Sequence, residues 1–130
     1  MRVVAWNIRA GAGVRADAIA RQLVRWQPDV VALSEFRGTP PSVRLATRLA
    51  AAGLTHQCAT CDPRAPRRNA LLVAARWPLE RLGSRPAPRD RCRWLLVGVA
   101  APVPVTVGAM HVPNRVTGRK YRHRFRPFGC

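Results

Sequence analysis

The sequence predicts an α/β fold with a strand–helix–strand–helix start followed by mixed or antiparallel strands. The start is indicated by two apolar runs, residues 2–8 and 29–36, each followed by a segment with apolar residues at helical spacing. The remainder is indicated by three further apolar runs, residues 69–76, 94–100 and 103–112, with no helical pattern between them. Hydrophobic residues make up 48% of the 130 residues, enough for one domain with a core.

The first predicted helix follows a turn that contains Gly11 and Gly13. Asp17 suits the positive N-terminal end of a helix, and Pro28 stops the helical pattern. The face expected to be buried carries apolar residues at helical spacing: Ala16, Ile19, Ala20, Leu23 and Val24.

The second predicted helix begins with the sequence Thr39-Pro40-Pro41, because proline is favoured in a first helical turn. Leu45 and Leu49 form its inner face, and Gly53 ends it. The strand between the two helices, residues 29–36, is apolar almost throughout, which is typical of a strand covered on both faces of a sheet.

The chain is strongly basic, with 23 Lys and Arg residues against 6 Asp and Glu and a formal net charge of +17. Such a charge attracts polyanions, with nucleic acid first among them. A compositional origin is an equal alternative, because Arg, Ala, Pro, Gly and Val dominate, as expected from GC-rich coding DNA. No apolar run of roughly 18 residues spans a membrane and the start does not resemble a signal peptide, so we expect a cytoplasmic location with reduced cysteines.

Polar residues stand where three of the predicted strands end. Asn7 closes the first strand, Glu35 the second and His111 the last. In an open α/β sheet, ligands collect beyond the carboxyl ends of the strands, so these residues are candidates for a functional site. Alternatives from the residues alone are that Asn7 caps the turn after its strand, that Glu35 pairs with Arg37 or Arg9 on the surface, and that His111 is a core histidine.

Four stretches, in order, resemble successive motifs of the endonuclease/exonuclease/phosphatase family, whose members are DNase I-like and exonuclease III-like enzymes. They are AWNIRAG around Asn7, PDVVALSEFRG around Glu35, NALLVAAR from Asn69 and VGAMHVPN around His111. The resemblance implies a partial DNase I-like α/β sandwich whose second half is absent. It also implies hydrolysis of phosphodiester or phosphomonoester bonds, in nucleic acid or another phosphoester substrate, with Mg²⁺ or Mn²⁺.

The resemblance also implies roles for individual residues. Glu35 matches the metal-binding glutamate of the family, and Asn7 the asparagine that supports both the metal and the scissile phosphate. His111 matches the residue that hydrogen-bonds a phosphate oxygen, and Asn114 lies in the same turn and would orient the substrate. Asn69 opens a strand that supports the site. A lone glutamate at a sheet rim suits magnesium, which keeps several waters and accepts substrate oxygens as ligands.

Two segments that the family needs do not occur in this chain. They are Gly-Asp-x-Asn and, further on, Ser-Asp-His, whose Asp-His pair activates the attacking water. No Asp follows Asp90, and the stretch after Tyr121 departs from the family pattern. We therefore expect a family domain over residues 1–121 and a basic, disordered tail over residues 122–130, the product of a truncation or frameshift. We also expect the chain to be inactive or weakly active.

Two further functions remain open. One is a non-catalytic, basic nucleic-acid-binding remnant. The other is a zinc-stapled interaction module, because Cys58 and Cys61 form a C-x-x-C pair near His56, with Cys92 as a further ligand. The pair falls in one of two segments predicted as loops, residues 58–68 and 77–93. We further expect an apolar sheet face without cover, since the missing half would largely supply the second sheet, and hence aggregation or self-association.

Overall fold

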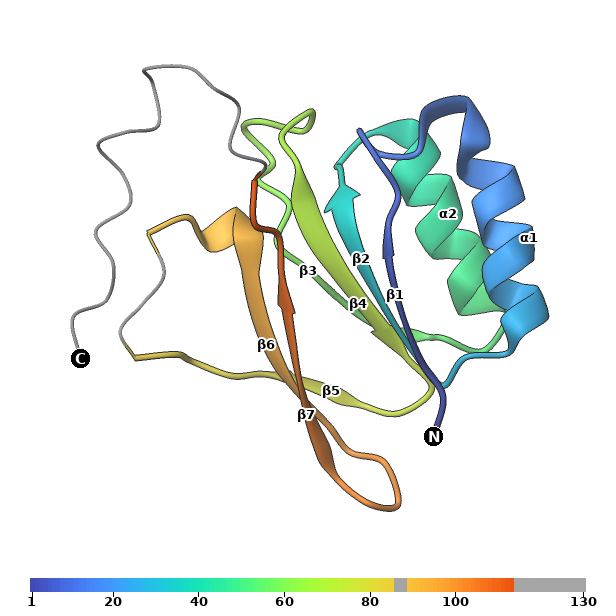
Figure 1. Cartoon of the computed structure of the whole chain (residues 1–130), viewed down its shortest axis with the longest axis vertical. Helices are drawn as coiled ribbons and strands as arrows, with labels where there is room; N and C mark the ends of the chain where they lie inside the picture. Colours follow the sequence, from blue (N-terminus) through green and yellow to red (C-terminus); the bar gives the residue numbers. More distant parts are fainter. Residues whose placement is uncertain (86–88, 114–130) are drawn as a thin grey trace.

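A computed structural model describes residues 1–85 and 89–113, which form three layers: two helices, a four-stranded sheet and a three-stranded sheet (Figure 1). The strand order is β1-β2-β4-β3 in the first sheet and β5-β6-β7 in the second. The predicted α/β class is confirmed.

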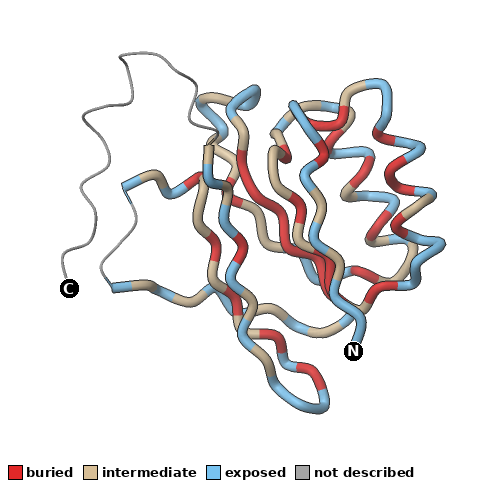
Figure 2. The backbone as a smooth tube through the Cα atoms, viewed as in Figure 1, coloured by how far each residue is buried: buried red, intermediate tan, exposed pale blue. Residues whose placement is uncertain are grey.

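The first sheet is mixed. β1 (Val3–Asn7) runs parallel to β2 (Val30–Phe36), as a strand–helix–strand connection requires. β4 (Ala70–Ala75) runs antiparallel to both β2 and β3 (His56–Ala59). The central strands β2 and β4 are apolar because both of their faces are covered, and every residue of β4 is buried (Figure 2).

The helices cover one face of the first sheet. After a 3₁₀ turn, η1 (Gly13–Arg15), α1 (Ala16–Trp26) buries four of the five apolar residues predicted for its inner face, whereas Val24 is exposed. It ends at Gln27, which has a left-handed φ of 49° and donates its N–H to Val24 O at 3.1 Å. α2 (Pro40–Ala51) packs beside α1 and buries its predicted inner face against the same core.

The second sheet covers the opposite face of the first sheet. It consists of β5 (Leu79–Arg81), β6 (Trp94–Val99) and β7 (Val105–Met110), all antiparallel, with a 3₁₀ turn, η2 (Arg91–Arg93), before β6. Alternate residues of β6 point into the core between the sheets and meet the inward residues of β4. The expectation of an uncovered face was therefore wrong for β2 and β4, which β5, β6 and β7 cover, whereas Val3 and Ala5 of β1 are exposed.

Two strands were not predicted: β5 lies in a segment expected to be a loop, and β3 (His56–Ala59) overlaps the start of the other expected loop, residues 58–68. β3 and β5 are short, and each pairs with one neighbour only, so their outward side chains are polar and exposed. Cys58 consequently lies within β3 rather than in a loop. The predicted tail, residues 122–130, and Asn114 lie outside the described residues.

No helix among the described residues is long and apolar enough to cross a membrane.

Candidate active site

The polar residues expected from the sequence gather at one edge of the first sheet. β1 and β2 run parallel with Asn7 opposite Ser34, so both strands end at this edge. β4 runs antiparallel to β2 and therefore begins at the same edge, directly after Asn69. The fold thus brings Asn7, Glu35 and Asn69 together from three separate parts of the sequence.

Asn7 and Glu35 are in direct contact. Asn7 Nδ2 donates a hydrogen bond to Glu35 Oε1 at 3.0 Å, and Asn7 Oδ1 accepts one from the Arg9 N–H at 2.9 Å. The asparagine therefore caps the turn after β1 and also holds the carboxylate. Within the described residues Glu35 forms no ion pair, so pairing with Arg37 or Arg9 is not the role of this carboxylate.

The turn after β1 points two backbone N–H groups towards Glu35. Arg9 and Ala10 have left-handed φ values of 54° and 49°, which are unusual for residues with a side chain. In this conformation the Ala10 N–H donates to Glu35 Oε2 at 2.9 Å, and the Gly11 N–H donates to Glu35 O at 2.8 Å. Successive N–H groups that converge in this way favour an anionic partner.

Gly11 occupies a position that no other residue fits without displacement. Its φ is 74°, and a Cβ atom there would lie 3.0 Å from both Ser42 Oγ and Arg37 Cδ. Ser42 is fully buried, and its hydroxyl donates to Gly11 O at 2.9 Å and accepts from the Arg37 N–H at 3.2 Å. The start of α2 therefore fixes the turn that holds the glutamate.

A β-bulge places Glu35 at the rim. The pairing of β2 with β4 shifts between Ser34 and Phe36, so Glu35 has no partner in the ladder. Its own φ is 57°, in the left-handed region. Bulges re-aim side chains, and backbone strain persists where surrounding contacts hold it. Here the hydrogen bonds from Asn7, Ala10 and Gly11 hold it.

The surroundings of Glu35 favour its charged form. The Ala10 N–H and then the Asn7 amide lower the pKa of the Glu35 carboxyl, and the nearby charges of His111 and Arg37 lower it further. Partial burial acts in the opposite direction but does not reverse the sign. Glu35 is therefore a carboxylate at neutral pH, available to a cation.

Asn69 contacts Arg37 rather than Glu35. Asn69 Oδ1 accepts a hydrogen bond from Arg37 Nε at 2.7 Å, across 32 positions of sequence. This bond fixes the guanidinium beside the carboxylate, where its charge acts on Glu35. Arg37 was not among the site residues expected from the sequence, although it lies two positions after Glu35 and carries the charge that a phosphate requires.

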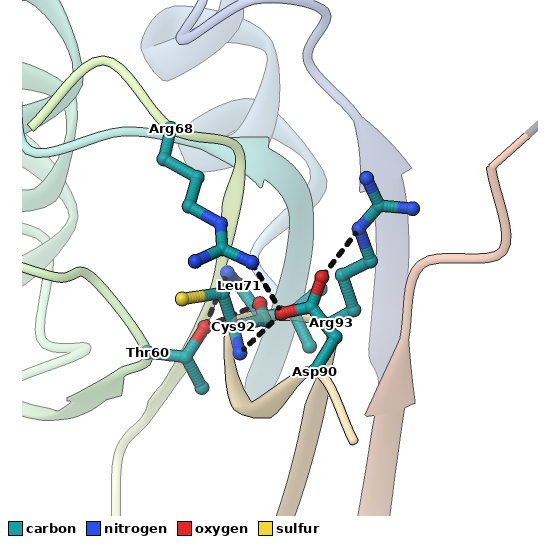
Figure 3. A network of polar contacts seen from close by, with 6 residues as sticks. All are labelled: Thr60, Arg68, Leu71, Asp90, Cys92 and Arg93. Atoms are coloured by element: carbon teal, nitrogen blue, oxygen red, sulfur yellow. Dashed lines mark hydrogen bonds and ion pairs between the residues drawn. The ribbon is translucent and has the colours of Figure 1, made fainter. Parts of the chain in front are cut away.

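His111 reaches the same edge from the second sheet. It follows β7, is half-buried, and donates its backbone N–H to Arg93 O at 3.1 Å, so it is not a core histidine. Arg93 belongs to an ion-pair network in which Asp90 contacts Arg93 Nε at 3.1 Å and Arg68 Nη2 at 3.0 Å (Figure 3). The second sheet therefore holds His111 through the segment before β6.

The residues present fit a weakly held divalent metal. Each oxygen of Glu35 accepts one hydrogen bond, which leaves further lone pairs on both. No group of three or more His, Cys, Asp or Glu side chains that could hold a metal occurs in residues 1–85 and 89–113. One carboxylate with waters and substrate oxygens suits magnesium, whereas a closed zinc site would need four protein ligands.

The two cysteines of the C-x-x-C pair face different cores. Cys58 packs into the core between the sheets, while Cys61 packs against the core under the helices. His56 is exposed at the start of β3. This arrangement gives no support to the zinc-stapled module.

Asp29, the second residue of the family-like stretch PDVVALSEFRG, lies at the other end of β2. Its carboxylate accepts from the Arg2 N–H at 2.7 Å and contacts Arg76 Nε at 3.5 Å. These contacts join the start of β1 to the end of β4, so this motif residue acts on the fold and not at the site.

Comparisons with known proteins agree with this architecture. A sequence model of the Endonuclease/Exonuclease/phosphatase family matches residues 4–127. The crystal structure of an endonuclease/exonuclease/phosphatase from Beutenbergia cavernae DSM 12333 is 26% identical with a TM-score of 0.63, and the match covers 86% of this chain and 38% of that one. The crystal structure of SmcL is 20% identical with a TM-score of 0.61, covering 85% of this chain and 47% of that one. A comparison with curated proteins found no match.

The fold is part of a DNase I-like α/β sandwich, and the chain spans less than half the length of either solved structure. The chain belongs to the endonuclease/exonuclease/phosphatase family. This is a family of hydrolases that act on nucleic acid or other phosphoester substrates and generally depend on a divalent metal.

Proposed function

We propose that this chain carries part of a phosphoesterase site that uses Mg²⁺ or Mn²⁺, with Glu35 as the carboxylate ligand and Asn7 beside it. The observation that carries the proposal is the contact of Asn7 with Glu35 at the rim of the first sheet, supported by the Ala10 N–H. A structural carboxylate would not need a bulge, a positive φ and two hydrogen bonds to its carboxylate oxygens at a strand end.

The surrounding residues have distinct roles in the proposed site. A bound divalent ion would polarise a phosphoryl oxygen and offset the charge that develops on it. Asn7 and the turn after β1 hold Glu35 in place, while the guanidinium of Arg37, fixed by Asn69, attracts the phosphate. His111, held from the second sheet through the Arg93 carbonyl, would hydrogen-bond a phosphate oxygen.

The same proposal predicts weak or no hydrolysis by this chain alone. Hydrolysis needs a positioned base for water, and the sequence has no Asp after Asp90 to orient a histidine there. Residues that act as a catalytic unit fail together, so a metal site without its base does not restore the rate. Asn114, which we expect to orient the substrate, lies outside the described residues.

Metal binding tests the ligand assignment. Mg²⁺ or Mn²⁺ is titrated against the wild type, Glu35→Gln and the matched control Glu80→Gln, whose carboxylate is exposed on β5. We expect weak binding by the wild type and the control, and an affinity at least about tenfold lower in Glu35→Gln, the range seen when a metal ligand or its partner is lost. Equal affinity in all three proteins would remove Glu35 from the metal site.

Activity tests the second part of the proposal. The purified chain is assayed with Mg²⁺ on abasic DNA, single-stranded RNA and a chromogenic phosphodiester. We expect no turnover above that of Glu35→Gln. Turnover that survives purification and disappears in Glu35→Gln would show that the chain is a complete, minimal enzyme.

A second candidate function, polyanion binding without catalysis, is favoured by unpaired arginines in two loops. Arg64, Arg67, Arg89 and Arg91 are exposed and form no ion pair within the described residues. Each phosphate that they neutralise releases counterions, so the affinity for DNA or RNA falls steeply with salt and shows no sequence preference.

Paired substitutions test this second function. Arg64→Gln with Arg67→Gln should reduce the slope of log affinity against log salt by roughly 2, since each phosphate contact contributes about 0.9. The control pair, Arg21→Gln with Arg44→Gln, removes the same charge from the helical face. Equal losses in both pairs would mean that net charge, and not these loops, drives the binding.

A further inference from the structure

Cys61 and Cys92, which have no role in the proposed site, line one pocket beside the turn η2. The pocket has a volume of about 590 Å³ and lies between the end of β3, the segment after β5 and the turn η2. Its lining includes Cys61, Cys92, Trp94, Arg81 and Arg91. Cys92 is 8% exposed and Cys61 is half-buried, so the pocket gives access mainly to Cys61.

A buried hydroxyl holds the two cysteine-bearing segments together. Thr60, which directly precedes Cys61, donates its hydroxyl to Cys92 O at 2.7 Å and accepts from the Leu71 N–H at 2.9 Å (Figure 3). Asp90 accepts from the Cys92 N–H at 3.1 Å and so caps the turn from the other end. The backbones at residues 60 and 92 therefore lie within one side-chain length of each other, and Cys61 and Cys92 both line the pocket beside this contact.

We propose that Cys61 and Cys92 are a modification site, at which a small disulfide oxidant such as glutathione disulfide converts the two thiols to an intramolecular disulfide. This inference does not depend on the proposed phosphoesterase function. Cys58 lies only three positions before Cys61, but we exclude it as the partner. Cys58 packs into the core between the sheets, whereas Cys61 packs against the core under the helices.

The chemistry balances with the oxidant named. One thiolate attacks the glutathione disulfide, forms a mixed disulfide and releases one glutathione thiolate. The second cysteine thiolate then attacks the cysteine sulfur of the mixed disulfide and releases the second glutathione. Two S–H bonds are lost, one S–S bond forms in the protein, and the oxidant is reduced to two glutathione thiols.

The pocket suits an anionic thiol reagent. Arg81 and Arg91 line it together with one carboxylate, Asp62, so the lining is net positive and attracts the carboxylates of glutathione disulfide. Burial, and then the neighbouring Cys92, raise the pKa of the Cys61 thiol. The attacking thiolate is therefore scarce at neutral pH, and the reaction is slow until the pH is mildly alkaline.

The disulfide would fix the segment that supports His111. It would close a loop between the end of β3 and η2, next to Arg93, whose carbonyl holds the His111 N–H. Cross-linking of a loop of this length stabilises mainly by constraining the unfolded chain, so the melting temperature should rise by about 5 °C or more.

The experiment uses the full chain and a variant that retains only the two cysteines of interest. The variant is Cys58→Ala with Cys130→Ala, Cys130 being outside the described residues. Both proteins are reduced, exposed under native, mildly alkaline conditions to a glutathione redox buffer, quenched with an alkylating reagent, and mapped by peptide mass spectrometry.

The expected product is a monomer that has lost two hydrogens, with a Cys61–Cys92 peptide link in both proteins, a raised melting temperature, and reversal by dithiothreitol. A link between Cys58 and Cys61 in the wild type would overturn the inference. So would glutathionylation that stops at Cys61, linked dimers, or a Cys61–Cys92 link that forms only in denaturant. If the variant does not fold, the peptide map of the wild type decides alone.

Discussion

The two sheets of this molecule are covered to different degrees. In the first sheet, β2 and β4 lie between the helices and the second sheet, and every residue of β4 and most of β2 are buried. In the second sheet, β6 alternates buried and half-buried residues, so it is covered on one face only by the described residues. A rigid double-sided core thus lies directly behind the rim that carries Glu35.

This difference explains where the strained backbone is found. Within residues 1–85 and 89–113, the five non-glycine residues with a positive φ belong to the turn after β1, the end of α1 and Glu35 itself, all beside the first sheet. A conformation that costs free energy persists only where the surrounding contacts determine it, and the double-sided core provides such contacts. The second sheet instead contributes to the site indirectly, by holding His111 through Arg93.

The largest expected effect is a contrast between two leucines. Leu72 of β4 is 2% exposed and packs under the helices, while Leu96 of β6 is half-buried on the outward face. Leu72→Ala leaves a cavity and should lower the free energy of unfolding by about 2–5 kcal/mol. Leu96→Ala should cost about 1 kcal/mol or less. Urea denaturation measures both, and equal losses would mean that the outer face of the second sheet is covered in the folded protein.

The next effect concerns the hydroxyl of Thr60, which connects the segment after β3 to the segment before β6. Thr60→Val keeps the shape of the side chain but leaves the Leu71 N–H and the Cys92 carbonyl without this partner, so it should cost about 2–3 kcal/mol. Thr106→Val, on the exposed side of β7, makes the same chemical change with no such contact and should be nearly neutral. A neutral Thr60→Val would show that the two sheets are held by apolar packing alone.

The strands and helices could be predicted wherever the local pattern reflects burial. The helical stripe of α1 and the unbroken apolar runs of β2 and β4 were predicted because each buries a continuous surface. β3 and β5 were missed because short edge strands with exposed residues such as Gln57 and Glu80 have no such pattern. The cover of the first sheet was misjudged because the packing of β6 onto β4 is a tertiary contact that leaves no local pattern in the sequence.

The candidate site could also be predicted only in part. The approach of Asn7 to Glu35 follows from two parallel strands that end at one edge, which the sequence allows one to predict. The Ala10 N–H that completes the carboxylate's environment was not predictable, because alanine rarely adopts a left-handed φ. The pairing of Arg37 with Asn69 joins residues 32 positions apart and has no local signal.

A smaller effect compares two glycines in the turn that holds Glu35. Gly11 and Gly13 both have positive φ values, 74° and 54°, so alanine is strained at either position. A Cβ at Gly11 would also press on the buried Ser42 hydroxyl, whereas nothing lies within 4 Å of one at Gly13. Gly11→Ala should therefore cost about 1–2 kcal/mol more than Gly13→Ala in thermal denaturation, if the turn is as tightly held as its contacts indicate. Equal costs would mean that the turn relaxes freely.

The smallest expected effect compares the two surfaces outside the cores. On the helical side, Asp17 contacts Arg48 Nη1 at 2.9 Å, and both side chains are about half exposed, 58% and 44%. On the other side, Asp90 contacts both Arg68 and Arg93 and caps η2. An exposed pair gains little because water screens it and two long side chains lose freedom, so Asp17→Asn should cost about 0.5 kcal/mol or less.

Asp90→Asn keeps an oxygen for the Cys92 N–H but removes the charge between two arginines, so it should cost about 1 kcal/mol. Most of that cost should disappear in molar salt, because the Asp90 side chain is still one-third exposed and its ion pairs are screened. Denaturation of both variants at low and high salt provides the measurement. If the cost of Asp90→Asn does not change with salt, the cap on η2 dominates over the ion pairs. The segment that supports His111 would then be held by its backbone hydrogen bonds, as the turn after β1 is held on the opposite side of the site.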